Sequence, residues 1–211
     1  MKNIILLLFL ISFISCNKKQ VLDITIKDDV EILSSDEFEG RQTGSEGEQK
    51  AADYISKRYK DLGLEPKGTD NYYQRFSFKP KTNPHQKVNY TVTDGDSTIT
   101  GINVLGLIDN KATNTVVIGA HYDHLGYGAE GSLYRGEKAI HNGADDNASG
   151  VAVLLDLAKK LKDRNTNNNY LFIAFSGEEM GLLGSNYFVK NPTIDTKAVS
   201  YMINMDMVVR L

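Results

Sequence analysis

Three short and almost continuous apolar runs are the feature that most restricts how this chain can fold. They lie at 115–120, 170–175 and 199–204, and each has the length of a strand rather than of a helix. A strand that is apolar along its whole length is buried on both faces, which is typical of a sheet covered by helices. Residues 148–161 separate the first two runs and have apolar side chains at helical spacing. We therefore predict a three-layer α/β/α fold with a mixed, largely parallel sheet.

The other predicted elements surround this core within one domain, at 31–211. A helix is expected at 47–62, because Ser45 and Glu48 have the spacing of a capping box and Gly63 can end the helix. Weaker periodic patterns predict strands at 88–93 and 102–108, a helix at 179–189, and mainly loop at 66–86, which contains three prolines.

The N-terminus has the pattern of an export signal. Lys2 precedes the apolar run Ile4–Ile14, which is too short to span a bilayer and fits a signal peptide over residues 1–15. Cys16 follows at once, as in a bacterial lipoprotein, so a lipid on Cys16 would anchor the protein to a membrane surface, with 16–30 as a tether. The alternative is a plain secretory signal with an incidental cysteine. Both readings place the protein outside the cytoplasm.

The charge balance argues against one class of partner. The chain has 24 Lys and Arg residues against 27 Asp and Glu residues, which gives a formal net charge of -3. A protein whose main partner is nucleic acid normally presents a basic face. We therefore expect no nucleic-acid partner.

Acidic and histidine side chains follow the predicted buried strands. The carboxyl ends of strands in such a sheet form the usual ligand-binding edge, so residues far apart in sequence can meet there. Taken singly, each acid has an ordinary explanation, such as capping a helix. Together, carboxylates and imidazole suit Zn²⁺, with Mn²⁺ or Co²⁺ as alternatives, and their number suggests two ions sharing one carboxylate. The four groups are His121, Asp123 and His124; Asp145 and Asp146; Glu178 and Glu179; and Asp206.

These segments resemble the co-catalytic zinc exopeptidases of metallopeptidase family 28, of the aminopeptidase Y type. The resemblance covers about residues 30–211 and includes Phe38–Arg41 near the N-terminus. Its four ordered motifs are AHYDHLG at 120–126, NGADDNASG at 142–150, SGEEMGLLGS at 176–185 and NMDM at 204–207.

The resemblance implies a site with two Zn²⁺ ions and a metal-bound water that attacks the N-terminal peptide bond. It implies that Glu178 is the general base and that Asp123 hydrogen-bonds His121 and fixes its ring. Asp146 is expected to cap the following helix, and His124 to line the entrance without binding metal. The implied metal ligands are His121 and Asp206 on one zinc, Glu179 on the second zinc, and Asp145 bridging both.

The implied activity is that of an aminopeptidase acting on the N-termini of peptides or proteins. Residues 126–142 form an inserted loop that we expect to border the substrate cleft, with Tyr134 and Arg135 as candidate contacts and His141 outside the ligand set. A solvated surface loop is the competing interpretation.

The sequence departs from the family pattern in one respect. The family has a further histidine ligand well beyond the position of Asp206, whereas this sequence ends at Leu211. We therefore expect a domain lacking its C-terminal part, with exposed apolar sheet surface, a second zinc without its imidazole ligand, and weak activity or none.

Three alternatives remain open from the sequence. A glutaminyl cyclase-like acyltransferase shares the resembled fold but typically works with one zinc. A non-catalytic peptide-binding surface protein would not need Glu178. Carboxypeptidase action is a variant within the same family.

Overall fold

The computed structural model describes residues 23–80, 88–128, 132–162, 164 and 166–208. The signal peptide predicted at 1–15 and the anchor predicted at Cys16 lie outside these residues and stay predictions. Within the described residues, every helix is either too short or too polar to cross a membrane.

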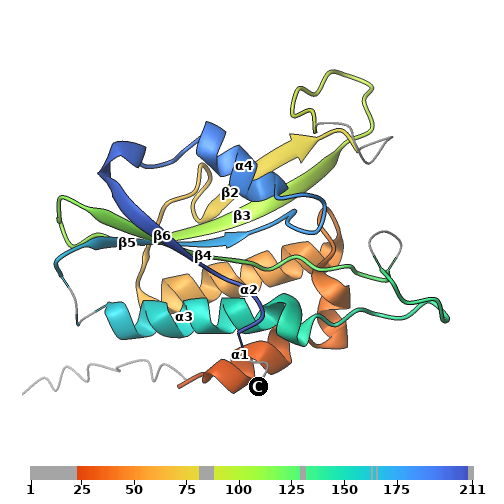
Figure 1. Cartoon of the computed structure of the whole chain (residues 1–211), viewed down its shortest axis with the longest axis horizontal. Helices are drawn as coiled ribbons and strands as arrows, with labels where there is room; N and C mark the ends of the chain where they lie inside the picture. The colour runs from red at the N-terminus through yellow and green to blue at the C-terminus, as the bar shows by residue number, and fades with distance from the viewer. Residues whose placement is uncertain (1–22, 81–87, 129–131, 163, 165, 209–211) are drawn as a thin grey trace, which may run out of the picture.

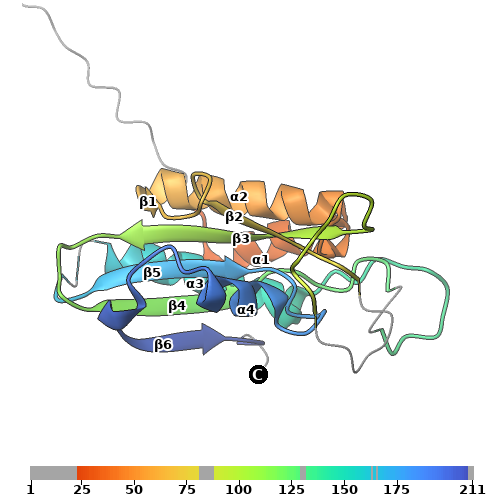
Figure 2. The same ribbon diagram turned by 90° about the horizontal axis from the view of Figure 1, so that it is seen from above.

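A mixed sheet forms the centre of the molecule (Figure 1 and Figure 2). The strand order is β1-β3-β5-β4-β6, with β2 also paired to β3. Strands β5, β4 and β6 run parallel, whereas β3 pairs antiparallel with β1, β2 and β5. The mixed sheet is confirmed, but less of it is parallel than predicted, because apolar runs do not encode strand direction. The strands are β1 Glu65–Pro66, β2 Tyr73–Phe78, β3 Ile99–Ile108, β4 Thr115–His121, β5 Asn169–Phe175 and β6 Val199–Met205.

Helices cover both faces of the sheet, as predicted. Helices α1, α2 and α3 lie on one face and α4 lies on the other (Figure 1). The side chains of β5 alternate between the two helical layers. Phe172 and Ala174 pack in the core under α2 and α3, while Ile173 and Phe175 pack with Phe188 of α4. The helices are α1 Ile26–Leu33, α2 Glu46–Leu62, α3 Gly150–Leu161 and α4 Leu183–Lys190, with shorter helical turns η1 Asp36–Arg41, η2 Ala144–Ser149 and η3 Thr196–Ala198.

The predicted tether at 16–30 is wrong at its C-terminal end, where α1 begins at Ile26. Thr25 and Asp28 form a reciprocal capping box, in which each side chain accepts a hydrogen bond from the other residue's backbone N–H. Leu33 and Asp29 are buried, so the helix is docked on the domain rather than exposed as a linker.

The region at 66–86, predicted to be mainly loop, contains strand β2. Gln74, Phe76 and Phe78 alternate as buried residues along β2, and the strand pairs with β3 over its whole length. Prolines flank this strand and do not interrupt it. The strand predicted at 88–93 is instead an isolated bridge between Asn89 and Lys79.

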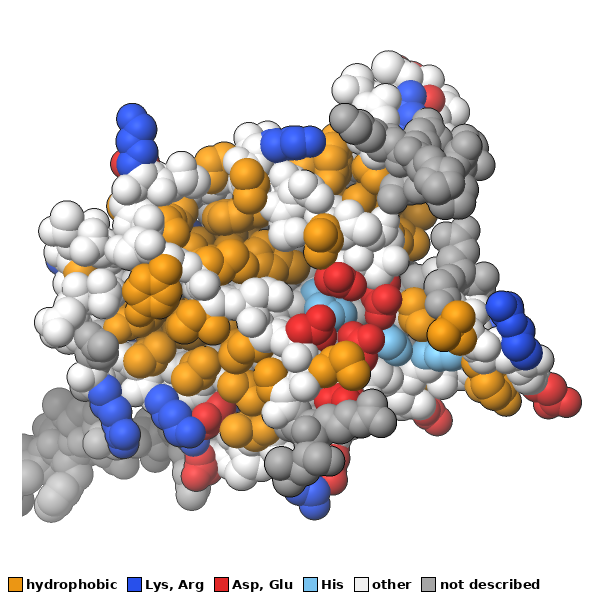
Figure 3. Space-filling model, viewed as in Figure 1, with side chains coloured by type: hydrophobic (Ala, Val, Ile, Leu, Met, Phe, Trp, Pro, Cys, Tyr) orange, Lys and Arg blue, Asp and Glu red, His pale blue; other side chains and the backbone are white. Residues whose placement is uncertain are grey.

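Strand β6 was predicted to be buried, and this is wrong. β6 is an edge strand, and Tyr201, Met202 and Ile203 are 44–55% exposed. Their exposure agrees with the expected apolar sheet surface, which Figure 3 shows as hydrophobic side chains beside the acidic cluster.

Candidate metal centre

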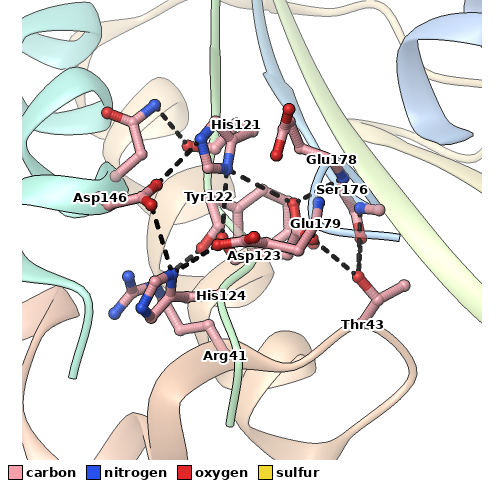
Figure 4. A network of polar contacts seen from close by, with 12 residues as sticks. Arg41, Thr43, His121, Tyr122, Asp123, His124, Asp146, Ser176, Glu178 and Glu179 are labelled. Atoms are coloured by element: carbon pink, nitrogen blue, oxygen red, sulfur yellow. Dashed lines mark hydrogen bonds and ion pairs between the residues drawn. The ribbon is translucent and has the colours of Figure 1, made fainter. Parts of the chain in front are cut away.

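The predicted ligand-bearing segments meet at one edge of the sheet. His121 is the last residue of β4, Glu178 and Glu179 follow β5, and Asp206 follows β6. Asp146 lies in the turn η2 before α3. Figure 4 shows the side chains of His121, Asp146, Glu178 and Glu179, and Figure 3 shows red acidic side chains around pale blue histidines at the surface.

One group of donor atoms is centred on His121. Its Nε2 lies 3.3 Å from Asp146 Oδ1 and 3.4 Å from Asp206 Oδ1. The His121 ring is 4% exposed, whereas the Asp206 side chain is 51% exposed, so this group opens to solvent on the Asp206 side.

A second group is centred on His124. Its Nδ1 lies 2.7 Å from Glu179 Oε1 and 4.0 Å from Asp146 Oδ2. Asp146 therefore belongs to both groups, through a different oxygen in each. His124 was predicted to line the entrance, but the structure places it inside the second group.

Asp145, the predicted bridging ligand, belongs to neither group of donors, whereas Asp146 belongs to both. The physical reason is the backbone of η2, in which Asp146 and Asn147 leave helical geometry. A regular helix start would have made Asp146 a capping residue, as predicted. The actual turn directs Asp146 to His121, while the backbone oxygen of Asp145 accepts a hydrogen bond from Ser149.

Asp123 has a wider set of contacts than predicted. His121 Nδ1 lies 3.2 Å from its backbone oxygen and 3.7 Å from its carboxylate. The buried carboxylate accepts hydrogen bonds from the backbone N–H groups of Glu178 and Glu179 and from the Thr43 hydroxyl. Asp123 thus holds the turn that carries both glutamates as well as facing the histidine.

Asn147 was not predicted as a site residue, yet it connects three of the segments. Its amide donates to the backbone oxygens of His121 and Met205, and its Oδ1 accepts from the N–H groups of Gly150 and Met207. The side chain is fully buried. Its place within the NGADDNASG motif was the only signal in the sequence.

Arg41 fixes the loop that leads to Asp146. Its buried guanidinium donates to four backbone carbonyls, those of Leu33, Tyr122, Asn142 and Gly143. Burial lowers the pKa of Arg41 to about 10, against the opposing effect of Asp123 and Asp146. Because the guanidinium N–H groups donate to backbone carbonyls, Arg41 forms no ion pair, among the described residues, with the carboxylates of the two donor groups, and its charge does not replace that of a metal ion there.

The electrostatics of the site fit divalent cations. In the described part of the chain, the ion pairs of Asp146, Glu179 and Asp206 are with histidine. Burial alone lowers the pKa of His121, but hydrogen bonds to Asp123 and Asp146 outweigh it and raise the pKa to about 11. The raised pKa of His121 shows that the surrounding carboxylates stabilise a positive charge at the imidazole. A cation bound there would be stabilised in the same way, and a set of nitrogen and oxygen donors suits zinc.

A cavity of about 250 Å³ adjoins the first group of donors. His121, Glu178 and Asp206 line its polar side, and the apolar part is formed by Phe175, Leu182 and Met202. Burial, with the charges of Asp123, Glu179 and Asp206, raises the pKa of Glu178, although His121 acts in the opposite direction. Glu178 therefore lies at the polar side of the cavity with a pKa above that of an ordinary glutamate.

The inserted loop at 126–142 reaches the second group through its C-terminal end. The His141 ring lies 6.4 Å from the His124 ring, and the Tyr134 ring lies 6.2 Å from that of His141. Tyr134 is 60% exposed. These contacts place part of the loop beside the second group of donors. That the loop borders a substrate cleft, with Tyr134 and Arg135 as contacts, stays a prediction, and residues 129–131 lie outside the described residues.

Glu48 lies beneath the site, and the predicted capping box only half forms. Ser45 accepts a hydrogen bond from Glu48 N–H, but the Glu48 carboxylate accepts from Gly44 and Ile102 N–H groups and from Ser176. Burial raises the pKa of Glu48 to about 7, although the hydrogen bonds from Ser176 and Gly44 lower it.

The raised pKa of Glu48 predicts a pH dependence of stability. The folded state holds a proton that the unfolded state releases near its ordinary pKa of about 4.3, so the free energy of unfolding falls as pH rises from there to about 7. The slope reaches at most about 1.4 kcal/mol per pH unit. Glu48→Gln should flatten this slope in urea unfolding at pH 5 and pH 7. Glu46→Gln, at an exposed position of the same helix, is the control; equal slopes for wild type and Glu48→Gln would contradict the prediction.

The comparison with family models shows which family the chain belongs to. The model of peptidase family M28 matches residues 103–211, which is more than half of the chain. The chain belongs to peptidase family M28. The matched part contains all the metal-donor residues described above, and the resemblance drawn from the sequence is confirmed.

Curated relatives of the M28 chain match it over different lengths. The alkaline phosphatase isozyme conversion protein of Escherichia coli is 30% identical over 172 residues, which cover 80% of this chain and 47% of that protein. Aminopeptidase YwaD of Bacillus subtilis is 34% identical over 99 residues, which cover 46% of this chain and 19% of that protein. The chain thus spans about half the length of the first relative and about a fifth of the length of the second.

Solved structures share the fold of the M28 chain. A Zn-dependent exopeptidase from Parabacteroides distasonis superposes with a TM-score of 0.67 at 20% identity, covering 89% of this chain and 63% of that one. Tannerella forsythia glutaminyl cyclase also gives a TM-score of 0.67, at 21% identity, covering 87% of this chain and 61% of that one. At these identities the similarity shows the fold and does not separate the two activities.

Proposed function

We propose that the protein is a zinc-dependent aminopeptidase that hydrolyses the N-terminal bond of a peptide or protein. The observation that carries this proposal is the sharing of Asp146 by two groups of nitrogen and oxygen donors beside Glu178. Membership of peptidase family M28 and the relative named aminopeptidase support it.

The residues at the sheet edge would hold two zinc ions. His121 and Asp206 would bind one ion, Glu179 would bind the other, and Asp146 would bridge them. When bound, zinc supplies Lewis-acid polarisation of the substrate carbonyl and lowers the pKa of a water molecule.

Glu178 would move the proton in this reaction. It takes a proton from the attacking water and passes it to the amine of the leaving peptide. Its raised pKa places it nearer to neutral pH than an ordinary carboxylate, which suits both transfers. Asp123 keeps Glu178 in place through the backbone N–H at 3.1 Å.

Glu178→Gln is expected to lower kcat by roughly 10²–10⁴-fold, because glutamine cannot accept the proton. A sensitive fluorogenic leucine amide, assayed with added zinc, measures the rate, and its N-acetylated form is the control for a free amino terminus. Zinc content should match that of the wild type, since Glu178 lies in neither group of donors. A wild-type rate for Glu178→Gln, or cleavage of the acetylated substrate, would refute the proposal.

Glutaminyl cyclase activity is the second candidate, because solved cyclases share the fold. A glutaminyl amide substrate separates the two: a cyclase releases ammonia and leaves the amide bond intact, whereas an aminopeptidase releases the fluorophore. The two groups of donors that share Asp146 favour two ions and therefore the aminopeptidase.

A further inference from the structure

Three consecutive backbone N–H groups in the turn after β5 are held by two linked side chains. Glu178 N–H donates to Asp123 Oδ1 at 3.1 Å, and Glu179 N–H donates to Asp123 Oδ2 at 3.3 Å. The third group, Gly177 N–H, donates to the Thr43 hydroxyl at 3.1 Å. That hydroxyl in turn donates to Asp123 Oδ2 at 3.1 Å (Figure 4). The proposed function gives Asp123 a role but leaves Thr43 without one.

We infer that Thr43 is a positioning residue, which aligns Glu178 and Glu179 from beneath the site. This inference rests on the proposed function and adds to it a side chain from the segment between η1 and α2. That segment lies outside residues 103–211, which the family model matches. Thr43 does not line the cavity and belongs to neither group of donors, so it acts through the backbone of the turn.

The turn after β5 depends on such support because its backbone is irregular. Gly177 has a φ of +70°, a conformation that glycine adopts readily and that turns the chain directly after the strand. Successive N–H groups in such a turn form a concave site for an acceptor. Asp123 fills this site for two of the N–H groups, and the Thr43 hydroxyl fills it for the third. With the backbone held in this way, the glutamate side chains are left to face the site.

A hydroxyl is the group that can make both contacts of Thr43 at once. Its one hydrogen is donated to Asp123, and its lone pairs can accept from Gly177 N–H. Thr43 is 5% exposed and Asp123 is fully buried, so both contacts are made away from bulk solvent. Serine offers the same hydroxyl, whereas valine has a similar shape but can neither donate nor accept.

Thr43 is itself held in place by Glu48 and Ser176. The Glu48 carboxylate accepts from the N–H of Gly44, the residue after Thr43, at 2.6 Å and from Ile102 N–H of β3 at 3.0 Å. The Ser176 hydroxyl contacts Glu48 and lies 3.3 Å from the Thr43 hydroxyl. Glu48, Ser176 and Thr43 are all buried. A buried set of contacts from α2, β3 and the end of β5 therefore fixes the hydroxyl against the turn.

Amide hydrogen exchange, measured by NMR, tests the inference without any activity assay. In Thr43→Val the three amides at 177–179 should exchange roughly tenfold faster than in wild type, the factor that corresponds to one ordinary hydrogen bond. Thr43→Ala, which introduces no new side-chain contact, should show the same increase, and Thr43→Ser should keep the wild-type rates. Thr115→Val is the matched control. Thr115 is 6% exposed but begins β4, at the end of the strand away from His121, so these three amides should be unchanged.

Kinetics separate positioning from a purely structural role. At saturating zinc, Thr43→Val should lower kcat on the fluorogenic leucine amide by roughly 10–100-fold, the range for a residue that supports a metal site, while KM changes little. Thr43→Ser should restore kcat, and Thr115→Val should keep it. A variant that had only lost stability would keep the wild-type kcat for each folded molecule.

Two kinds of result would overturn the inference. One is a Thr43→Val protein that keeps the wild-type exchange rates at 177–179 or the wild-type kcat. The other is exchange that rises equally in distant elements such as α3, which would show lost stability rather than lost alignment. If wild type hydrolysed no N-terminal amide bond, the aminopeptidase proposal would fail instead, and the exchange rates would still decide whether Thr43 aligns the turn.

Discussion

Replacing Asp146 with asparagine is expected to remove zinc from both positions of the centre and, with it, any hydrolysis. Asp146 contributes one oxygen to the His121 group and the other oxygen to the His124 group. An amide has one weaker oxygen donor and a nitrogen that repels cations. The loss should exceed the 10–100-fold that removal of a merely supporting residue costs, for either ion. Metal analysis after dialysis at fixed free zinc measures it.

Asp145→Asn is the matched control for Asp146→Asn. Asp145 is adjacent in sequence and has the same chemistry, but its carboxylate lies in neither group. It should therefore keep two zinc ions. If Asp145→Asn lost zinc and Asp146→Asn retained it, the bridging role would return to Asp145, and the described geometry of η2 would be wrong.

Arg58→Met is expected to lower the free energy of unfolding by about 3–5 kcal/mol, because it leaves a buried carboxylate without its cation. Arg58 Nη2 lies 3.1 Å from Asp29 Oδ2, and the two side chains are 6% and 1% exposed. Tyr54 also donates to Asp29, at 2.5 Å. Burial raises the pKa of Asp29 although Tyr54 and Arg58 lower it, so this carboxylate depends on its partners. Urea unfolding at pH 7 measures the change.

Two further variants identify the cause. Lys57→Met removes a cation one position away, from an exposed pair with Asp61, and should cost less than about 1 kcal/mol. The double variant Asp29→Leu with Arg58→Met should recover most of the loss, since an apolar pair avoids the buried charge. A loss for Arg58→Met no larger than that for Lys57→Met would show that the ion pair does not hold α1 on α2.

The fold could be predicted best where local pattern and burial agree. Strands β4 and β5 and helices α2 and α3 lie close to their predicted ranges, because a strand buried on both faces and an amphipathic helix each have a strong local pattern. Strand β2 was missed because prolines nearby are typical of loops. Helix α1 was missed because its short pattern follows the polar residues after Cys16, which together were assigned to a tether.

The site could be predicted to the level of the segment but not of the atom. His121, Glu178, Glu179 and Asp206 meet at the predicted sheet edge, since the ends of neighbouring parallel strands must lie together. The choice between Asp145 and Asp146 depends on how one irregular turn directs two consecutive side chains. Hydrophobic periodicity in the sequence carries no information on the direction in which the side chains of such a turn point.

The sequence by itself determined the layered α/β architecture, the family and the edge of the sheet where acids and histidines gather. These follow from local periodicity and ordered motifs, which persist whatever the distant parts of the chain do. Only the tertiary structure decided that Asp146 joins the two donor groups, that His124 faces Glu179, and that α1 docks through a buried ion pair. Each of these depends on a contact between segments far apart in sequence, and such contacts exist only once the chain has folded.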